Sequence, residues 1–195
     1  MSRTATVRRT TGETDIKITL DLDGSGTCNI STGVGFFDHM LTALGRHSLL
    51  DLSISCKGDT WVDDHHTVED VGIALGQALR MALGDKAGIR RFGDVCVPLD
   101  ETLVLAAVDI SGRGELYWDV PIAPQKVGTF DTELGHEFFA GLARDAGLTL
   151  HLRLLCGENA HHILEATFKA FARALRAAVE ADPRVSGIPS TKGVL

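Results

Sequence analysis

The amino-acid sequence predicts an α+β fold made of two similar βββαβα halves, with helices packed between two four-stranded sheets. Two observations lead to this prediction: a histidine-rich segment occurs twice in similar apolar surroundings, and each copy follows the same succession of strand-like and helix-like segments. The sheet of each half needs helices to cover one of its faces. If the two halves pack helix layer against helix layer, both helix layers and the sheet faces that they cover are buried. We expect one unit over residues 1–195, with halves at 1–90 and 91–185 and a flexible tail at 186–195.

The repeat is centred on two histidine doublets, each followed by a glutamate. These segments are His65-His66-Thr67-Val68-Glu69 and His161-His162-Ile163-Leu164-Glu165. A shift of 96 residues also places Val68, Gly72, Leu75, Leu79 and Ala82 on Leu164, Phe168, Phe171, Leu175 and Ala178. All but one of these pairs keep apolar side chains at three- and four-residue spacing, the period of a helix with one buried stripe. Upstream, His39 falls nearly opposite His136, at an offset of 97.

The elements of the first half follow in order. Residues 4–10 and 15–22 are predicted to be strands, the second because Ile16, Ile18, Leu20 and Leu22 alternate with polar neighbours. The turn signal at 23–26 precedes a third strand at 27–31, and we expect these strands to form a meander. A helix at 36–46, a strand at 51–57, a loop at 58–64 and a long helix to Leu83 complete the half.

The second half repeats this order. Strands are predicted at 95–97, 102–110 and 115–120, a helix at 132–146, a strand at 148–155 and a final helix at 161–181 that Pro183 and Gly187 end. Both doublets then lie at helix amino ends, just after a loop, where side chains are well positioned and accessible.

Composition narrows the class of protein. With 195 residues, 44% of them apolar and 23% charged, the chain is typical of a globular protein. A net charge of −7 without any basic run disfavours nucleic acid or an anionic membrane as a partner. No stretch approaches the roughly 20 apolar residues of a membrane helix, and the first residues lack the apolar block of a secretory signal, so we expect a cytoplasmic protein. Its cysteines are widely scattered, which favours free thiols over disulfides: Cys28, Cys56, Cys96 and Cys156.

The repeated histidines and glutamates indicate metal chemistry, because imidazole nitrogens and carboxylate oxygens bind divalent transition ions. His66 and Glu69 share a helix face at i, i+3, whereas adjacent histidines diverge by ~100° and cannot easily hold one ion together. Each doublet therefore serves two ions, with the glutamate joining one of them. The candidate ligands form two sets of three histidines and one glutamate: His39, His65, His66, Glu69, His136, His161, His162 and Glu165.

This ligand count leaves the metal open. Four protein ligands leave room for substrate on a six-coordinate manganese or iron ion but would fill a tetrahedral zinc site. The alternative for a single doublet is a pair of solvated histidines that flank a helix, an interpretation that the duplication disfavours.

Several motifs together resemble the imidazoleglycerol-phosphate dehydratase family. They are residues 35–41, 63–70, 98–101 (Pro-Leu-Asp-Glu), 111–113, 157–162 with 165–170, and 190–193. The resemblance spans essentially the whole chain. It implies a hydro-lyase of histidine biosynthesis that dehydrates D-erythro-imidazole glycerol phosphate to imidazole acetol phosphate. It also implies a single catalytic unit with two Mn²⁺ ions per active site, in a homo-oligomer of about 24 subunits whose sites form between chains.

The substrate's chemistry explains why metal ions are useful in such an enzyme. Its glycerol chain has no carbonyl that would acidify the proton to be removed, so the ring must accept electrons. A metal-bound imidazolate can expel the hydroxyl group, while an acid–base group serves that hydroxyl and the carbon-bound proton. The resemblance gives this role to Glu13, in the first hairpin. The other expected catalytic residues are His65, His66, Glu69, His161, His162 and Glu165.

The resemblance also implies a set of substrate-binding residues: Glu13, His39, His47, Arg91, Arg113, Lys169, Ser190 and Lys192. The cations among them suit a phosphate group, because arginine makes paired bonds to its oxygens and lysine acts as a point charge. Arg90 is a rival to Arg91, and His151 matches no motif and is expected to have no catalytic role.

Two other classes of function remain open. In the first, the metal ions only join subunits of an assembly protein, which the phosphate-binding cations and Glu13 disfavour. In the second, the protein is a two-metal hydrolase, but six histidines and two glutamates are poor in the bridging carboxylates that such an enzyme uses.

Overall fold

The structure, a computed structural model, describes residues 3–195; Met1 and Ser2, which belong to the predicted first half, lie outside the described residues. The first half contains β1 (Thr4–Thr10), β2 (Thr14–Asp21), β3 (Cys28–Ser31), α1 (Gly35–Ser48), β4 (Asp51–Gly58) and α2 (His65–Leu83). The second contains β5 (Phe92–Leu99), β6 (Thr102–Asp109), β7 (Glu115–Asp119), α3 (Leu134–Ala146), β10 (Thr149–Cys156) and α4 (Ala160–Val179). A short hairpin that the sequence did not predict, β8 (Lys126–Val127) with β9 (Phe130–Asp131), precedes α3. The predicted βββαβα order of both halves is confirmed.

The strands of residues 3–195 form two four-stranded sheets of equivalent order, β1-β2-β4-β3 and β5-β6-β10-β7, besides the short hairpin. The predicted meander is wrong, because β3 does not pair with β2. It lies parallel to β4, with Cys28 opposite Leu52, and β4 itself pairs with β2. Helix α1 connects β3 to β4, and a helical crossover returns the chain in its original direction, so a parallel pair results. The second half has the same arrangement, with β7 parallel to β10.

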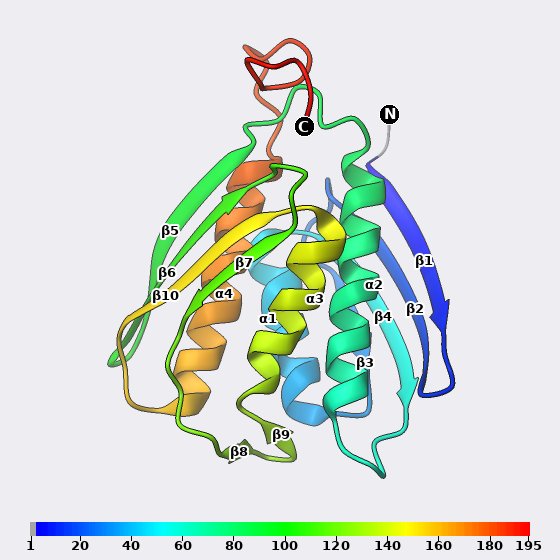
Figure 1. Ribbon diagram of the computed structural model, residues 1–195, viewed down its shortest axis with the longest axis vertical. Helices are drawn as coiled ribbons and strands as arrows, with labels where there is room; N and C mark the ends of the chain where they lie inside the picture. The colour runs from blue at the N-terminus through cyan, green and yellow to red at the C-terminus, as the bar shows by residue number, and fades with distance from the viewer. Residues whose placement is uncertain (1–2) are drawn as a thin grey trace.

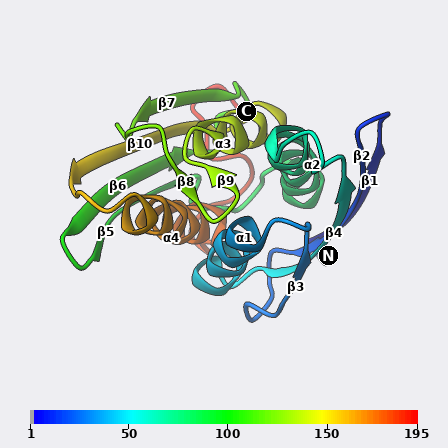
Figure 2. The same ribbon diagram turned by 90° about the horizontal axis from the view of Figure 1, so that it is seen from below.

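The helices lie between the two sheets, as Figures 1 and 2 show. Helix α2 packs on β1 and β2, α4 packs on β5 and β6, α3 lies along α2, and α1 lies along α4. The inward side chains of β2, namely Ile16, Ile18 and Leu20, are buried, while their neighbours in the strand face outward. This confirms the alternation predicted from the sequence and places the helix layers in the core.

The mismatched position of the repeat, Gly72 against Phe168, has a structural reason. A Cβ atom at Gly72 would lie 2.5 Å from the carbonyl oxygen of Phe138, so α3 approaches the backbone of α2 closely at this point. Phe168 on α4 instead stacks on Phe138, with ring centroids 5.0 Å apart. At the Gly72 position, the backbones of α2 and α3 pack directly against each other. At the equivalent Phe168 position, an aromatic ring fills the space between the helices.

The boundaries of two elements differ from their predicted bounds for reasons that the packing explains. Strand β5 is longer than the predicted 95–97, since it includes Gly93 and Pro98, which are poor strand formers by propensity. Gly93 lacks a side chain where α4 passes, and a Cβ there would collide with the carbonyl of Ala174. The final helix ends at Val179 rather than at 181, because Glu180 is extended and the next residue, Ala181, bridges to Ile89.

No helix within residues 3–195 is both long enough and apolar enough to cross a membrane. The flexibility of the tail at 186–195 stays a prediction.

Candidate metal centre

All four helices that the structure describes begin at the same end of the molecule, the lower end in Figure 1. The doublets occupy the first turns of α2 and α4, His39 lies in the second turn of α1, and His136 lies in the first turn of α3. Helices α1, α2 and α4 follow β3, β4 and β10 of the two four-stranded sheets, and α3 follows the β8–β9 hairpin. The repeated fold therefore gathers the predicted ligands at one end.

One predicted ligand set is assembled. His39 from α1 meets His161 and Glu165 from α4, with all their donor atoms within 4.8 Å of one another. The Glu165 Oε2 atom lies 3.1 Å from His161 Nε2 and 3.5 Å from His39 Nε2. Phe36 packs its ring against His161 at a centroid distance of 5.1 Å and forms an apolar wall. Three converging donors of this kind suit a divalent transition ion.

The equivalent set in the other pair of helices is more open. His65 Nε2 lies 3.7 Å from Glu69 Oε2 on α2, while His136 on α3 turns its Nδ1 toward the neighbouring Glu137, at 2.8 Å. Among residues 3–195, only the group of His39, His161 and Glu165 has the compactness of a metal site. In both doublets the glutamate contacts the first histidine at i, i+4, rather than the second at the i, i+3 spacing considered from the sequence.

The second histidine of each doublet faces a different set of carboxylates. His66 Nδ1 lies 3.0 Å from Asp59 Oδ2, and its Nε2 lies 3.6 Å from Glu13 Oε1. His162 Nδ1 lies 2.8 Å from Glu101 Oε2, and its Nε2 lies 3.7 Å from Asp100 Oδ2. The predicted divergence is present, since the rings of each doublet are nearly perpendicular and more than 6 Å apart.

These carboxylates change the ionisation of the rings. The hydrogen bonds that His66 and His162 donate to Asp59 and Glu101 raise the pKa of each histidine. The pKa of Glu101 is lowered in turn, first by the backbone amide of Asn159 and then by His162. Asp59 and Glu101 were not predicted as site residues. Glu101 belongs to the Pro98–Glu101 motif, which could have indicated it, whereas Asp59 lies in a loop and has no periodic signal.

Cations adjoin the assembled set. Lys169 Nζ lies 2.6 Å from Glu165 Oε1, one helical turn farther along α4. Burial of Glu165 raises its pKa, but the hydrogen bond and charge of Lys169 outweigh this effect, and the net pKa is lowered. The pKa of His47 is lowered by burial and by the charges of Lys169 and Arg173. Of the predicted substrate residues, Lys169 therefore contacts the assembled metal ligands, and His47 lies near enough to Lys169 and Arg173 for their charges to lower its pKa.

The other predicted phosphate-binding residues lie elsewhere. Arg91 makes a paired bond to Asp109, at 2.7 and 3.2 Å, and donates to the carbonyl of Pro189 at 2.9 Å. Arg113 shares the same carboxylate at 3.2 Å. Ser190 and Lys192 follow Pro189 in the tail, and the rival Arg90 instead pairs with the exposed Glu180.

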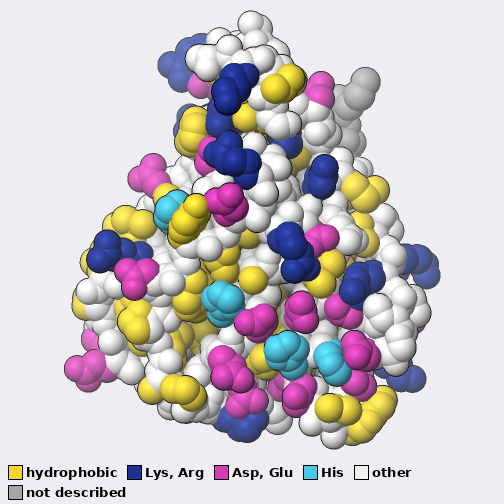
Figure 3. Space-filling model, in the orientation of Figure 1, with side chains coloured by type: hydrophobic (Ala, Val, Ile, Leu, Met, Phe, Trp, Pro, Cys, Tyr) yellow, Lys and Arg dark blue, Asp and Glu magenta, His cyan; other side chains and the backbone are white. Residues whose placement is uncertain are grey.

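This second group is far from the histidines of its own chain. The backbone amide of Arg91 donates to the carbonyl of Ala178, near the end of α4, whereas His161 lies at its beginning. The intervening 17 residues of helix correspond to about 26 Å at 1.5 Å per residue. On the face drawn in Figure 3, several histidine side chains lie among acidic side chains on the lower half, and several Lys and Arg side chains lie near the top.

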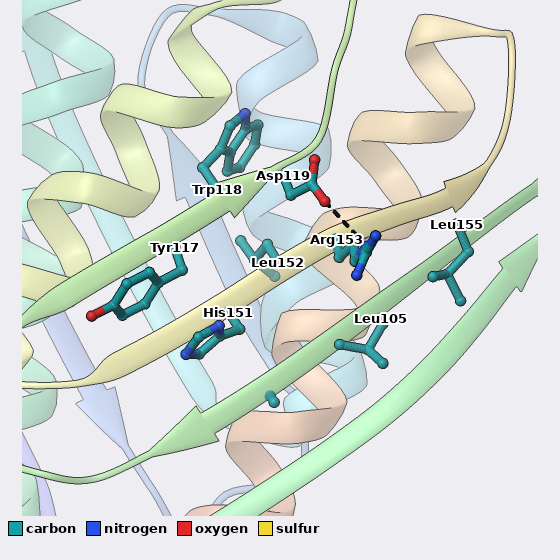
Figure 4. Close-up of a pocket in the computed structure, with 9 residues that line it drawn as sticks. Leu105, Tyr117, Trp118, Asp119, His151, Leu152, Arg153 and Leu155 are labelled. Carbon is teal, nitrogen blue, oxygen red and sulfur yellow. Dashed lines mark ion pairs between the residues drawn. The ribbon is translucent and has the colours of Figure 1, made fainter.

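A broad hollow of about 630 Å³ on the outer face of the second sheet is not part of this arrangement. There, Tyr117 stacks on His151 at 4.3 Å and Asp119 pairs with Arg153 at 3.1 Å, as Figure 4 shows. Asp119 and Arg153 balance each other's charge, and the Tyr117 hydroxyl donates to Glu115 at 2.6 Å. His151 thus lies on a strand, as predicted, and on the opposite side of the sheet from the helices.

Comparisons with known proteins agree with one another. The family described as Imidazoleglycerol-phosphate dehydratase matches residues 32–175. The chain is 61% identical over 196 aligned positions to the imidazoleglycerol-phosphate dehydratase of Granulibacter bethesdensis and to that of Acidiphilium cryptum, covering 100% of all three chains.

Two solved structures are similar over the whole fold. The crystal structure of imidazoleglycerol-phosphate dehydratase from Staphylococcus aureus has a TM-score of 0.84 and 44% identity, and the match covers 92% of this chain and 99% of that one. The Pyrococcus furiosus protein crystallised with the compound (S)-C348 has a TM-score of 0.84 and 42% identity, with 97% and 100% covered. The α+β architecture is therefore that of these proteins.

Proposed function

Since the chain belongs to the imidazoleglycerol-phosphate dehydratase family, we propose that it removes water from D-erythro-imidazole glycerol phosphate to give imidazole acetol phosphate, a step of histidine biosynthesis. The observation that carries the proposal is the convergence of His39, His161 and Glu165, with donor atoms within 4.8 Å of one another, at the helix ends where the duplicated motif lies. The activity is that of a hydro-lyase. A charged, phosphorylated substrate does not cross membranes readily, which supports a cytoplasmic location.

The residues present fit two Mn²⁺ ions per active site. Ligand atoms about 2.1 Å from one ion and 90–110° apart are separated by roughly 3 to 3.5 Å. The two distances from Glu165 Oε2 to the histidine nitrogens, 3.1 and 3.5 Å, fall in this range, and all three donor atoms lie within 4.8 Å of one another. His39, His161 and Glu165 would hold one ion, and His65, Glu69 and His136 form the equivalent set. The second histidines, His66 and His162, would complete them. When bound, the ions supply Lewis acidity to the substrate's imidazole ring and stabilise its loss of a proton.

Glu13 is the acid–base residue of this proposal. Its carboxylate is half exposed on the β1–β2 turn and lies 3.6 Å from His66 Nε2, so it can reach a molecule bound at the histidines. The turn holds it in place, because Thr11 Oγ1 accepts from the Glu13 amide and the Asp59 amide donates to the Glu13 carbonyl. Glu13 gives a proton to the departing hydroxyl and then takes the proton from the neighbouring carbon, so that water leaves and the enol forms.

The phosphate group requires a second copy of the chain. In the substrate, the imidazole ring and the phosphorus atom are joined by only a few bonds of about 1.5 Å each. The distance between them is therefore at most roughly 7 Å. The distance of about 26 Å between His161 and the Arg91 group is far larger. We therefore propose that Arg91, Arg113, Ser190 and Lys192 of a neighbouring subunit bind the phosphate, in a homo-oligomer of about 24 chains with sites between them.

The decisive experiment is a dehydration assay with imidazole glycerol phosphate on protein stripped of metal and then supplied with Mn²⁺ or Zn²⁺. The proposal expects no activity after stripping and recovery with Mn²⁺. An active metal-free preparation would refute the metal-dependent mechanism. A protein that binds metal and assembles but never turns over the substrate would support the alternative of a metal-stabilised assembly protein, and release of inorganic phosphate would support a hydrolase.

A further inference from the structure

In both doublets, the second histidine contacts a carboxylate that is not among the predicted metal ligands. In each, the second histidine directs Nδ1 at a carboxylate: Asp59 for His66, at 3.0 and 3.2 Å, and Glu101 for His162, at 2.8 Å. The two carboxylates come from different kinds of segment, a loop after β4 and the turn between β5 and β6. The same contact is therefore built twice from unrelated local structure.

A carboxylate at Nδ1 selects one form of a neutral imidazole ring. An ionised carboxylate can only accept a hydrogen bond, so the proton must lie on Nδ1, and the lone pair then lies on Nε2. The Nε2 atoms have no hydrogen-bond partner among residues 3–195, since the nearest carboxylate oxygens, on Glu13 and Asp100, are 3.6 and 3.7 Å away. Each ring thus presents an unshared lone pair toward the site.

We propose that Asp59 and Glu101 are positioning residues, which hold His66 and His162 in the Nδ1–H tautomer with Nε2 free to bind the metal ion. Histidine ligands commonly donate their second ring nitrogen to such an outer carboxylate, and loss of that partner weakens metal binding. This inference rests on the metal-dependent function proposed above.

The two carboxylates differ in a way that makes the inference testable. Both oxygens of Asp59 approach His66, and its side chain makes no other hydrogen bond within residues 3–195. Glu101 divides its oxygens: Oε1 accepts from the amides of Asn159 and Glu158, at 2.9 and 3.3 Å, and Oε2 faces His162. Replacement by the matching amide therefore has opposite consequences at the two positions.

In Glu101→Gln, the amide oxygen keeps the two backbone donors, so the amide nitrogen faces His162 Nδ1. That nitrogen donates, which moves the ring proton to Nε2 and removes the lone pair from the site. In Asp59→Asn, the side chain is free to turn its oxygen toward His66 Nδ1 and preserve the tautomer. We expect Mn²⁺ affinity to fall about 10- to 100-fold in Glu101→Gln and in Asp59→Ala, but less than about threefold in Asp59→Asn.

The readouts are Mn²⁺ affinity by calorimetry on the whole protein and the solid-state ¹⁵N spectrum of histidine-labelled, metal-free protein, which separates protonated from unprotonated ring nitrogens. Glu158→Ala is the matched control. It removes one negative charge from the same loop but keeps the backbone amide of residue 158, which donates a hydrogen bond to Glu101. This control should match the wild type in both readouts.

Three outcomes would overturn the inference. Wild-type affinity and spectrum in Glu101→Gln would show that Glu101 sets no tautomer. Equal losses of affinity in Asp59→Asn and Glu101→Gln, with an unchanged spectrum, would show that both residues act only through their negative charge and not by setting the tautomer. Wild-type protein that binds no Mn²⁺ would overturn this inference together with the proposed function, whereas the first two outcomes leave the proposed function intact.

Discussion

At the scale of single residues, Glu13 provides the most direct test of the chemistry. Glu13→Gln keeps the size of the side chain and removes its ability to transfer a proton, so we expect kcat to fall by a factor of about 10² to 10⁴ with little change in bound manganese. Steady-state kinetics and metal analysis of the same preparation measure both quantities. Asp15→Asn is the control, since within residues 3–195 the one hydrogen bond to this exposed carboxylate, in the same hairpin, comes from Thr10. Unchanged kcat in Glu13→Gln would remove Glu13 from the mechanism.

Cys56 gives a prediction about pH. Burial, followed by the charge of Asp70, raises the pKa of this thiol to about 11 from the model-peptide value of 9.0. Because the folded-state pKa lies above the unfolded-state value, the thiol's contribution to stability is fully present below pH 9 and is lost as pH rises through 11. The free energy of unfolding of Cys56→Ser, measured by denaturant titration, should therefore decrease less steeply between pH 9 and 11 than that of the wild type. Cys96→Ser, at an exposed thiol, should retain the wild-type slope.

The sequence could predict which residues carry donor atoms, but not how each is oriented. The duplicated doublets indicated His161 and Glu165, and the structure brings them together with His39. The orientation of His66 depends on Asp59, whose position follows from the path of a loop and from a hydrogen bond to the Glu13 turn. No periodicity records such a contact, which is why both outer carboxylates were missed.

At the scale of elements, the close contact of α2 with α3 depends on glycine. Gly72→Ala should destabilise the protein by about 1 to 3 kcal/mol, because the added methyl group meets the Phe138 carbonyl and rigid backbone must shift. This net loss already includes the gain of about 1 kcal/mol that alanine gives over glycine in an unobstructed helix. Gly35→Ala at the start of α1 is the control, since nothing lies within 4 Å of its added Cβ. Chemical denaturation of both variants measures the difference, and a Gly72→Ala protein as stable as the wild type would contradict the packing.

Element type was predictable where one side of a segment is buried and the other is not. Strand β2 and helix α4 have this character, and their patterns predicted them correctly. The ends of β5 were missed because Gly93 and Pro98 lower strand propensity while the approach of α4 favours the strand. The position of β3 was missed for a different reason: strand order depends on the crossover through α1, and no local pattern specifies it.

At the scale of the whole molecule, each chain carries two incomplete parts of the proposed site at opposite ends. The fold explains the separation, since α4 is a continuous helix with His161 at its start and the Arg91 contact near its end. No plausible bending of a buried helix brings these ends within the roughly 7 Å that the substrate spans. We therefore propose that a working site combines the histidine end of one chain with the arginine end of another.

This arrangement predicts complementation between inactive variants. We expect His161→Ala to be inactive because it lacks a metal ligand, and Arg91→Ala with Arg113→Ala to be inactive because it lacks phosphate-binding cations. When the two proteins are unfolded, mixed and refolded together, random assembly should place intact ends at roughly a quarter of the sites and restore about that fraction of wild-type activity. Mixing without unfolding is the control, in which activity should stay at the level of the separate variants. Coassembled variants that stay inactive would contradict a site shared between chains, because sites confined to single chains cannot be rescued by a partner.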